Sequence, residues 1–482
     1  MSVKKSIHVV IYLMSLGSLS AQNGFTKTYG AASLFNEAAD IAVDTSGRIF
    51  ICGSTGGYGA QNGDAAVLIT DSNGVQLDFK VYGNLHSESG KCIALFPSGG
   101  FAVAGTSNQS LNLSHQLYLV VANAGGDVLK DTIYESAAWA VPSAMVYSSD
   151  ETLILGVNKS SADEADNSFS VLKIRLTGEI IWQTDFINNP GNARLYDLIE
   201  LPDSTIIIAG SGSVSDSDSS DMMFAKLAYD GQVIWTKYYG EERHEWAASL
   251  CISNDNIVAV AANRILDNGE SSPQLLTMDT AGIVISEYFD SGFGEVTSVS
   301  YNPYNNSIFF AWDYTNNGTP KSAIFNFTID LVFRCNALPS GPLTAPFNGI
   351  ATCAGLNGYM HMCGSIENTG PGIISMYSFK AGDFCQHDSN LQVGIPEEIE
   401  NSKALLYPVP ANEVLYLELD KNSKNDVIVQ IRDLSGRLIT NWNSSTLGTT
   451  IAIDVQNINS GFYILQVANE NGIQSYPFIV KH

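Results

Sequence analysis

A turn glycine recurs at nearly constant spacing through most of this chain, and this repeat constrains the fold more than any other feature. Five such glycines stand 52, 52, 53 and 51 residues apart, and a sixth follows 100 residues later, at two periods. The six turns are Asn73-Gly74-Val75, Gly125-Gly126-Asp127, Thr177-Gly178-Glu179, Asp230-Gly231-Gln232, Ala281-Gly282-Ile283 and Ala381-Gly382-Asp383. The missing turn falls near residue 331, where Thr328-Ile329-Asp330-Leu331 lacks the glycine. Residues 25–388 therefore read as seven repeat units of about 50 residues.

Each unit contains the same four stretches of strand-like sequence. In the first unit, residues 39–43 alternate in polarity, residues 49–52 and 65–69 are apolar, and residues 75–81 end before Tyr82-Gly83. Four strands at this period predict a seven-bladed β-propeller, because one blade buries both faces only between its neighbours. The repeat resembles the long-period blades of exported bacterial propellers. A rod-like β-solenoid is the alternative, although its rungs are usually about half this length or less.

The segment Phe25-Thr26-Lys27-Thr28-Tyr29-Gly30 precedes the first unit but matches the end of a unit, as in Ile234-Trp235-Thr236-Lys237-Tyr238-Tyr239-Gly240. A propeller ring must close, because otherwise its first and last blades expose edge strands that pair with other chains. We therefore expect this N-terminal segment to supply the outer strand of the last blade.

The end of the chain carries four further segments in a fixed order. They are Leu-Tyr-Pro-Val-Pro-Ala-Asn (406–412), Ile-Arg-Asp-Leu-Ser-Gly-Arg (431–437), Ile-Asp-Val-Gln-Asn-Ile-Asn-Ser-Gly-Phe-Tyr-Ile-Leu-Gln-Val (453–467) and a final strand ending Phe-Ile-Val-Lys-His. This order resembles the C-terminal sorting domain of the type IX secretion system of Bacteroidetes. The family usually has Asn between the two prolines, where this chain has Val409. The resemblance implies a sorting motif made of Tyr407, Pro408, Pro410, Asn412, Asp433, Gly436, Arg437, Gly461, Tyr463 and Lys481.

The same region shows the two-residue alternation of half-buried strands, with turns at Ser435-Gly436 and Asn471-Gly472. We expect residues 404–482 to form a small immunoglobulin-like β-sandwich. An ordinary immunoglobulin-like binding module would explain the strands, but it would not explain the four segments in order.

The N-terminus has the organisation of a signal peptide. Lys4 and Lys5 precede an apolar stretch, residues 7–19, that is too short to span a bilayer, and a Ser-Leu-Ser-Ala-Gln segment follows. We expect residues 1–21 to be removed after Ala21 or one residue earlier, so that no transmembrane segment remains. The acidic stretch 389–403, which contains Pro396, predicts an exposed linker. The expected destination is the medium or the outer cell surface, reached through the periplasm.

The net charge of the chain argues against two classes of binding partner. The chain has 49 acidic and 24 basic residues, for a formal net charge of −25. Such a chain repels phosphate backbones and anionic lipids, which argues against nucleic-acid binding and against binding to membranes through basic patches. Only 15% of residues are charged and 42 are Gly, which favours sheets and turns over charged helices.

The sequence contains no catalytic or metal-binding motif that we recognise. It lacks His-Glu-x-x-His, a Gly-x-Ser-x-Gly elbow and a phosphate loop. The histidines beyond the signal peptide are scattered: His86, His115, His244, His361, His387 and His482. The seven cysteines lack the paired spacing of a zinc site. We therefore assign no catalytic, cofactor-binding or metal residue.

The cysteines follow the repeat instead. Cys92 and Cys251 fall in first strands, where we expect them to pack as small apolar side chains. Four others, Cys335, Cys353, Cys363 and Cys385, crowd the last quarter of the repeats. An oxidising periplasm permits disulfides among these four, which would staple the closing blade, but the sequence does not set their pairing.

Two weaker signals point to ligands. The stretches ending at Trp182 and Trp235 resemble the tryptophan-docking motifs of quinoprotein propellers, which bind pyrroloquinoline quinone. Only two of the seven units carry the Trp, so a packed aromatic is the simpler interpretation. Asp216, Asp218 and Asp221 offer oxygen ligands for Ca²⁺, but their loop lacks the turn glycine and distal Glu of a calcium loop, which favours a solvated acidic connection.

The sequence thus predicts a secreted or surface-anchored propeller with a sorting domain, acting as a binding or scaffold module for a glycan or protein. The alternative is a polymer-acting enzyme, a glycoside hydrolase or lyase, whose site at the axial mouth draws residues from several blades. Two carboxylates about 5–10 Å apart in an axial pocket would favour the enzyme.

Overall fold

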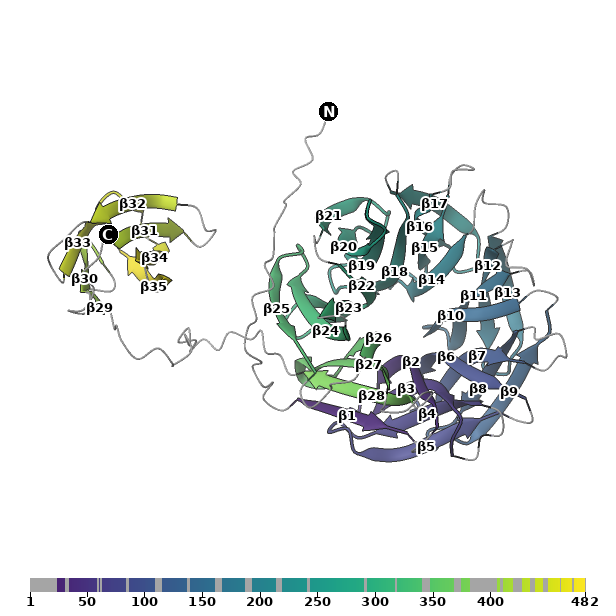
Figure 1. The fold of residues 1–482 in the computed structure, drawn as a ribbon. Helices are drawn as coiled ribbons and strands as arrows, with labels where there is room; N and C mark the ends of the chain where they lie inside the picture. The colour runs from purple at the N-terminus through teal and green to yellow at the C-terminus, as the bar shows by residue number, and fades with distance from the viewer. Residues whose placement is uncertain are drawn as a thin grey trace. The chain divides into compact units, whose positions relative to one another are not determined.

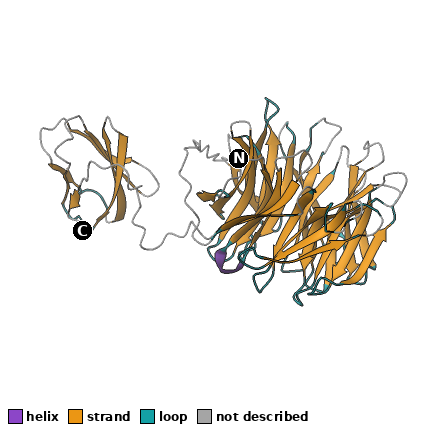
Figure 2. Cartoon of the chain, turned by 60° about the horizontal axis from the view of Figure 1, so that its bottom comes forward, coloured by secondary structure: helices purple, strands orange, loops and turns teal. Residues whose placement is uncertain are grey.

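The computed structural model of this chain contains, in the residues that it describes, β-strands and one short 3₁₀ turn as its regular secondary structure (Figure 2). It describes residues 24–30, 34–58, 60, 63–83, 86–108, 115–136, 139–160, 167–186, 193–213, 219–240, 243–289, 293–316, 319–339, 347–367, 374–381, 405–407, 411–418, 427–433, 438–444, 450–459, 461–469 and 472–481. Contacts divide the chain into two compact units, Met1–His387 and Asp388–His482. The predicted signal peptide and the predicted linker lie outside the described residues.

Seven four-stranded antiparallel sheets form the first unit and surround a common axis (Figure 1). Blade 1 consists of β2 (Asn36–Val43), β3 (Ile49–Thr55), β4 (Asp64–Thr70) and β5 (Gln76–Tyr82). Blade 2 consists of β6 (Glu88–Leu95), β7 (Phe101–Ser107), β8 (Gln116–Ala122) and β9 (Val128–Tyr134). Blade 3 consists of β10 (Trp139–Tyr147), β11 (Thr152–Ser160), β12 (Asn167–Arg175) and β13 (Ile180–Phe186). Blade 4 consists of β14 (Arg194–Glu200), β15 (Ile206–Gly212), β16 (Asp221–Leu227) and β17 (Val233–Tyr239).

The remaining blades follow the same order. Blade 5 consists of β18 (Glu245–Ile252), β19 (Val258–Ile265), β20 (Ser271–Met278) and β21 (Val284–Phe289). Blade 6 consists of β22 (Glu295–Asn302), β23 (Ser307–Asn316), β24 (Thr319–Thr328) and β25 (Phe333–Ala337). Blade 7 takes β26 (Phe347–Ala354), β27 (Met360–Glu367) and β28 (Ile374–Ala381), with a 3₁₀ turn, η1 (Leu356–Gly358), between the first two. The seven-bladed propeller predicted from the repeat is confirmed, and the solenoid alternative is wrong.

The N-terminal strand β1 (Phe25–Tyr29) completes blade 7. It pairs antiparallel with β28, with Phe25 opposite Lys380 and Tyr29 opposite Met376. The predicted ring closure is therefore confirmed. The pairing covers the edge that blade 7 would otherwise expose and joins the two ends of the repeat region.

The core lies between the blades. All seven residues of β4 and of β8 are buried, because the middle strands of a blade are covered on both faces. One apolar cluster joins Phe50 of blade 1 to Phe101 and Val120 of blade 2, and another joins blade 2 to blade 3 through Leu119 and Leu155. No blade buries both faces alone, which explains the continuous apolar runs in the sequence.

The turn between the third and fourth strands of each blade needs a residue with positive φ. Gly74, Gly126 and Gly178 adopt φ values of +69°, +77° and +88°. Leu331 adopts φ +59° at the corresponding turn of blade 6, so the missing marker is where the repeat predicted it. Gly382, the sixth glycine marker, lies outside the described residues.

A β-bulge interrupts the innermost strand of every blade at the same position. The seven bulges fall between Ala38 and Asp40, Gly90 and Cys92, Pro142 and Ala144, Leu195 and Asp197, Ala247 and Ser249, Val296 and Ser298, and Gly349 and Ala351. A bulge twists a strand and redirects its side chains. This regular defect places the first residue after each bulge at the junction with the next blade.

The C-terminal unit contains two sheets. One has the order β29-β30-β33, and the other has the order β32-β31-β34-β35. One apolar cluster, which includes Leu415, Val429, Ile453 and Leu465, takes side chains from both sheets. The strands are β29 (Leu405–Tyr407), β30 (Val414–Glu418), β31 (Val427–Asp433), β32 (Leu438–Ser444), β33 (Thr450–Asp454), β34 (Gly461–Asn469) and β35 (Gly472–Val480).

The cysteines divide into packed thiols and one disulfide. Cys92 is buried in the core between blades 2 and 3, and Cys251 packs on the core between blades 5 and 6, as predicted. Cys335 is disulfide-bonded to a partner outside the described residues. Cys353 and Cys363 are free thiols, so the structure excludes them from the disulfides that the sequence permitted.

Candidate functional site

Polar side chains next to the bulges join neighbouring blades. Asp40 accepts a hydrogen bond from the backbone N–H of Ile93 at 2.9 Å, and Asp197 accepts one from Leu250 N–H at 2.7 Å. Ser249 and Ser298 accept in the same way from the N–H groups of Val299 and Thr352. Each bond runs from one innermost strand to the next, so these residues hold the ring together.

A second set of side chains repeats this device one strand further out. Asn158 forms two hydrogen bonds with the backbone of Leu195 in the next blade, at 2.8 and 2.9 Å. Asn263 forms the same pair with Val296. Asp313 and Ser365 occupy the equivalent positions and accept from the N–H groups of Gly349 and Ala38.

Asp40 and Asp197, the two carboxylates that follow a bulge, have raised pKa values like those of a catalytic acid. Burial raises the pKa of Asp40 to about 7 and that of Asp197 to about 6, and the charge of Asp197 raises the pKa of Asp40 further by a smaller amount. However, both oxygens of each carboxylate already accept hydrogen bonds, because Oδ1 of Asp40 binds Ile41 N–H and Oδ1 of Asp197 binds Leu198 N–H. Their contacts identify them as structural links of the ring.

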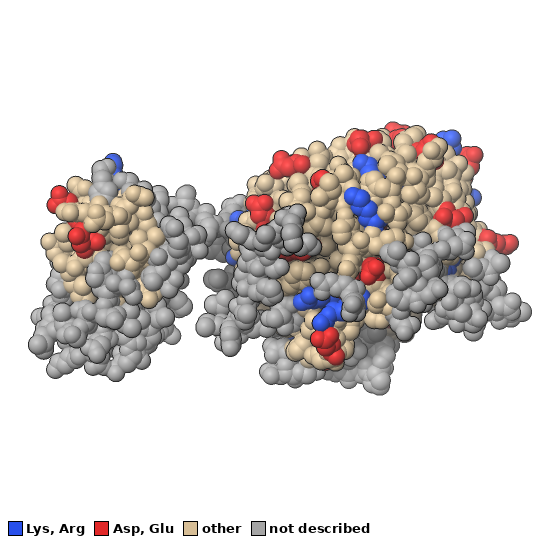
Figure 3. Space-filling model, turned by 90° about the horizontal axis from the view of Figure 1, so that it is seen from above, with Lys and Arg blue, Asp and Glu red and all other residues tan. Residues whose placement is uncertain are grey.

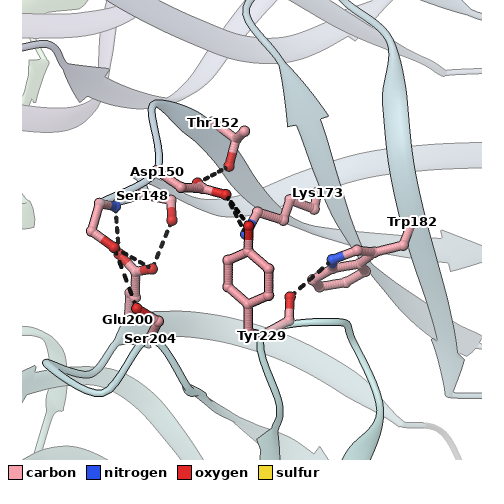
Figure 4. A network of polar contacts seen from close by, with 9 residues as sticks. Ser148, Asp150, Thr152, Lys173, Trp182, Glu200, Ser204 and Tyr229 are labelled. Carbon is pink, nitrogen blue, oxygen red and sulfur yellow. Dashed lines mark hydrogen bonds and ion pairs between the residues drawn. The ribbon is translucent and has the colours of Figure 1, made fainter.

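The most elaborate junction lies between blades 3 and 4 (Figure 4). The ammonium of Lys173, whose side chain is 2% exposed, lies 2.8 Å from Oδ2 of Asp150 and 3.6 Å from the ring centroid of Tyr229. The Tyr229 hydroxyl donates to the same carboxylate oxygen at 2.8 Å, and Thr152 donates to the other at 2.6 Å. Burial raises the pKa of Asp150, but the hydrogen bonds from Lys173 and the hydroxyls outweigh that effect and lower it.

Glu200 extends this network on the blade 4 side. It accepts hydrogen bonds from the Ser148 hydroxyl at 2.7 Å and from the Ser149 N–H at 2.9 Å. In Figure 4 the carboxylates of Asp150 and Glu200 are both surrounded by donors. Both oxygens of Asp150 and both oxygens of Glu200 already accept hydrogen bonds, so the network has the chemistry of a charged clamp between blades.

Trp182 and Trp235, the two residues of the quinone-docking hypothesis, also lie at junctions between blades. The Trp182 indole lies on the turn glycine of the next blade, since a Cβ at Gly231 would stand 2.7 Å from its ring. Its N–H donates to the carbonyl of Tyr229 at 3.2 Å. Trp235 lies on Gly282 in the same way. These contacts favour the packing interpretation over quinone binding.

A groove opens between blades 2 and 3, one junction before the network. It has a volume of about 640 Å³, and its lining includes Phe96, Val121, Leu129 and Leu176, with Lys130 at the rim. Phe96 and Val121 are buried, whereas Leu129 is 66% exposed. The lining is mainly apolar, and sequence reasoning did not find it.

In the part of the chain that the structure describes, the other candidate ligand residues are not brought together into a binding site. Among the described residues, no group of three or more His, Cys, Asp or Glu is arranged to hold a metal ion. Asp221 begins β16, and Asp216 and Asp218 lie outside the described residues, so the Ca²⁺ hypothesis stays a prediction. His361 is 3% exposed, and burial lowers its pKa to about 3, so this imidazole is neutral at physiological pH.

The described charged side chains on one face of the propeller do not form a patch of one sign (Figure 3). On the face drawn in Figure 3, acidic and basic side chains lie among neutral ones. The described part of the chain contains no helix long and apolar enough to cross a bilayer.

The predicted sorting residues meet in two places. Asp433 lies opposite Tyr463 in the pairing of β31 with β34, so the second and third sequence segments are neighbours. Ala411, next to Asn412, forms a parallel bridge with Val480, and the N–H of Lys481 donates to the Ala411 carbonyl at 2.9 Å. Tyr407 ends β29, and Gly461 begins β34 opposite Val480. Pro408, Pro410, Gly436 and Arg437 lie outside the described residues.

Most of these junction residues could have been found by aligning the repeat units. Asp40 and Asp197 are three periods apart, and Lys173 recurs one period later as Lys226, which approaches Thr280 of the next blade. Sequence reasoning missed them because only four of the seven units use a polar side chain after the bulge.

Comparison with known proteins agrees with the four segments at the end of the chain. Residues 405–481 match the family described as the secretion system C-terminal sorting domain. No curated protein sequence matches the chain.

Several solved structures resemble this one at low sequence identity. PorZ, a surface component of the type IX secretion system of Porphyromonas gingivalis, has 14% identity and a TM-score of 0.43, over 91% of this chain and 59% of that chain. The propeller of the Trilobed protease from Pyrococcus furiosus has 8% identity and a TM-score of 0.45, over 73% and 94%. The Neurospora crassa Pan2 WD40 domain has 11% identity and a TM-score of 0.45, over 71% and 89%. The chain thus spans about 59% of the length of PorZ.

The family match covers the segments whose residues meet in the C-terminal unit. It implies recognition by the type IX secretion machinery and export to the cell surface or the extracellular space. The chain is therefore a seven-bladed β-propeller protein whose residues 405–481 belong to the secretion system C-terminal sorting domain family.

Proposed function

We propose that this protein is a binding or scaffold module that acts outside the cell on a glycan or protein ligand. The observation that carries the proposal is the state of three carboxylates at the blade junctions. Asp40 and Asp197 each accept one hydrogen bond from the next blade and one from their own strand, and Asp150 accepts from Tyr229 of the next blade and from Thr152 of its own blade. A rigid ring with its acids occupied supports recognition at its surface and leaves those acids no role in proton transfer.

The export route is part of this proposal. Residues 1–21 act as a cleaved signal peptide that delivers the chain to the periplasm, and the sorting domain then directs it across the outer membrane of a Bacteroidetes cell. The immunoglobulin-like topology of residues 404–482 belongs to the same proposal, supported by two sheets that share one apolar core. The mature protein is then released or attached to the surface.

The experiment is an array of glycans and extracellular proteins probed with the purified mature chain, with and without Ca²⁺. Saturable capture of a glycan or protein supports the binding role. Turnover of a polysaccharide, detected as new reducing ends and abolished in Asp40→Asn or Asp197→Asn, would instead establish the polymer-acting enzyme. Calcium dependence of capture would assign a role to the acidic loop at 216–221.

A further inference from the structure

The groove between blades 2 and 3 exists because four repeat positions carry smaller side chains than their equivalents. One period later, the junction of blades 3 and 4 places Asp150, Thr152, Lys173 and Tyr229 at these positions. The groove has Ser98, Gly100, Val121 and Leu176 instead. Each equivalent pair lies 52 or 53 residues apart, the period of the repeat.

The fold fills this location with an aromatic ring at two other junctions. Tyr229 lies over the Lys173 ammonium at the junction of blades 3 and 4. At the junction of blades 7 and 1, the ring of Tyr359 lies 3.9 Å from the ammonium of Lys380, which donates to the Ser72 carbonyl of blade 1. A ring of this size therefore fits at this location of a junction. The groove has Leu176 and Gly100 at the positions of Tyr229 and Tyr359, and its own ring, Phe96, is buried and packs against Tyr147.

Charge at the rim specifies a second feature of the occupant. Lys130 is exposed at the groove edge, and within the described ranges no carboxylate lies in ion-pair distance of its ammonium. This lysine is a cation in a chain with 49 acidic and 24 basic residues. A ligand that places a carboxylate beside an apolar group would pair with Lys130.

We propose that the groove between blades 2 and 3 binds an aromatic side chain of a partner protein, with an adjacent carboxylate of that partner on Lys130. The inference rests on the proposed binding function and names its partner class as an extended acidic-aromatic peptide segment. The lining favours a peptide over a sugar, because Val121, Leu129 and Leu176 offer apolar contact and few hydrogen-bonding groups. The groove volume of about 640 Å³ exceeds that of one aromatic side chain, which leaves room for the flanking backbone.

The test uses the mature full-length chain and the fluorescein-labelled peptide Gly-Ser-Phe-Asp-Ser-Gly, with binding followed by fluorescence anisotropy. We expect saturable binding with a Kd on the order of 0.1 mM, the range of one buried ring with one ion pair. Replacing Phe by Ala in the peptide should abolish binding, and replacing Asp by Lys should weaken it by about 3- to 10-fold.

Two protein variants locate the binding. Ser98→Asp/Val121→Lys/Leu176→Tyr rebuilds the side chains of the next junction and should reduce affinity at least about tenfold by filling the groove. Leu176→Tyr alone, a single change at a partly buried position, is the fallback if the triple variant does not fold. Lys130→Glu should weaken binding of the acidic peptide, whereas Lys91→Glu, a matched exposed lysine of blade 2 outside the groove, should not.

Unchanged affinity in a folded filled variant overturns the proposal, as does equal binding of the Ala peptide or no binding of the Phe peptide by the wild-type chain. Competition by oligosaccharides but not by peptides would overturn the choice of partner class. The wider function is judged separately. If the filled variant loses the peptide but keeps the ligand found on the array, the groove is not the site of that ligand and the binding function still stands.

Discussion

The hydroxyl of Tyr82 donates a hydrogen bond of 2.9 Å to the carbonyl of Gly126, the turn glycine of the next blade. Tyr29 reaches Gly74 at 2.8 Å and Tyr134 reaches Gly178 at 2.7 Å in the same way. The tyrosine at the end of one unit and the glycine of the next are thus partners in one contact. The terminal tyrosine and the turn glycine, which are separate features of the repeat in the sequence, therefore form a single contact between neighbouring blades.

Removing this joint should destabilise the propeller. Tyr82→Phe keeps the ring and deletes only the hydroxyl, so we expect a loss of about 1 kcal/mol in the free energy of unfolding, measured by urea denaturation. Tyr304→Phe is the matched control, because Tyr304 is 57% exposed and its change should fall within about 0.5 kcal/mol. Equal effects for both variants would contradict the role of the joint.

The hairpins between first and second strands offer a reciprocal test of backbone strain. Glu151 adopts φ +65° where blade 2 has Gly99 at φ +86°. Glu151→Gly should stabilise the chain by about 0.5–1 kcal/mol, because glycine adopts this conformation without steric cost. Gly99→Glu should destabilise it by a similar amount, since a Cβ at Gly99 meets no atom closer than 3.4 Å and the cost is confined to the backbone. Thermal melting that moves in the same direction in both variants would refute the explanation.

Stability should fall as pH rises from about 4 to about 7. Burial raises the pKa of Asp40 to about 7 and that of Asp197 to about 6, so the folded chain binds more protons than the unfolded chain in this window. The expected fall is on the order of 2–4 kcal/mol. His361 acts in the opposite direction, because burial lowers its pKa to about 3 and its neutral form favours folding as pH rises. Asp40→Asn/Asp197→Asn should reverse or flatten the slope, measured by chemical denaturation across this range, and an unchanged slope would exclude the two carboxyls as its source.

The blade 3–4 clamp should show strong coupling between its two charges. Asp150→Ala leaves the Lys173 ammonium, which is 2% exposed, without its carboxylate and should cost about 2–4 kcal/mol. Lys173→Met should cost less, and the double variant should cost at least about 1 kcal/mol less than the sum. The control is Lys159→Met, which breaks a more exposed pair with Asp185 in the same blade and should cost under about 1 kcal/mol. Additive effects of Asp150→Ala and Lys173→Met would contradict the coupling.

Deleting residues 404–482 should block export and leave the propeller folded. The C-terminal unit has its own apolar core, so its removal exposes no propeller interior. In a native host the truncated chain should accumulate in the periplasm, with the melting transition of its propeller unchanged. Its appearance in the medium or on the cell surface would refute the sorting role, and loss of folding would mean that the two units share a core.

The number of blades and the way the ring closes could both be predicted from the amino-acid sequence. Both follow from local chemistry that repeats, since turn glycines, apolar middle strands and terminal tyrosines recur through most of the units. Leu331 shows how far this reaches, because the repeat located its turn even though the glycine is absent. The four C-terminal segments likewise identified the sorting domain before any fold was known, whereas its immunoglobulin-like topology and its individual motif residues remain predictions.

The contacts between repeat positions of different blades, and the roles of those residues, could be identified only from the folded structure. Asp40 and Ile93 are 53 residues apart and touch only when two blades stand side by side, and the pKa of Asp40 rises mainly because those blades exclude water. The role of Trp182 at a blade junction likewise follows only from the position of its ring on Gly231 in the folded chain. The groove depends on small side chains at four positions that two blades contribute. These positions are distant in the sequence, so the space between them can be recognised only after the fold brings them together.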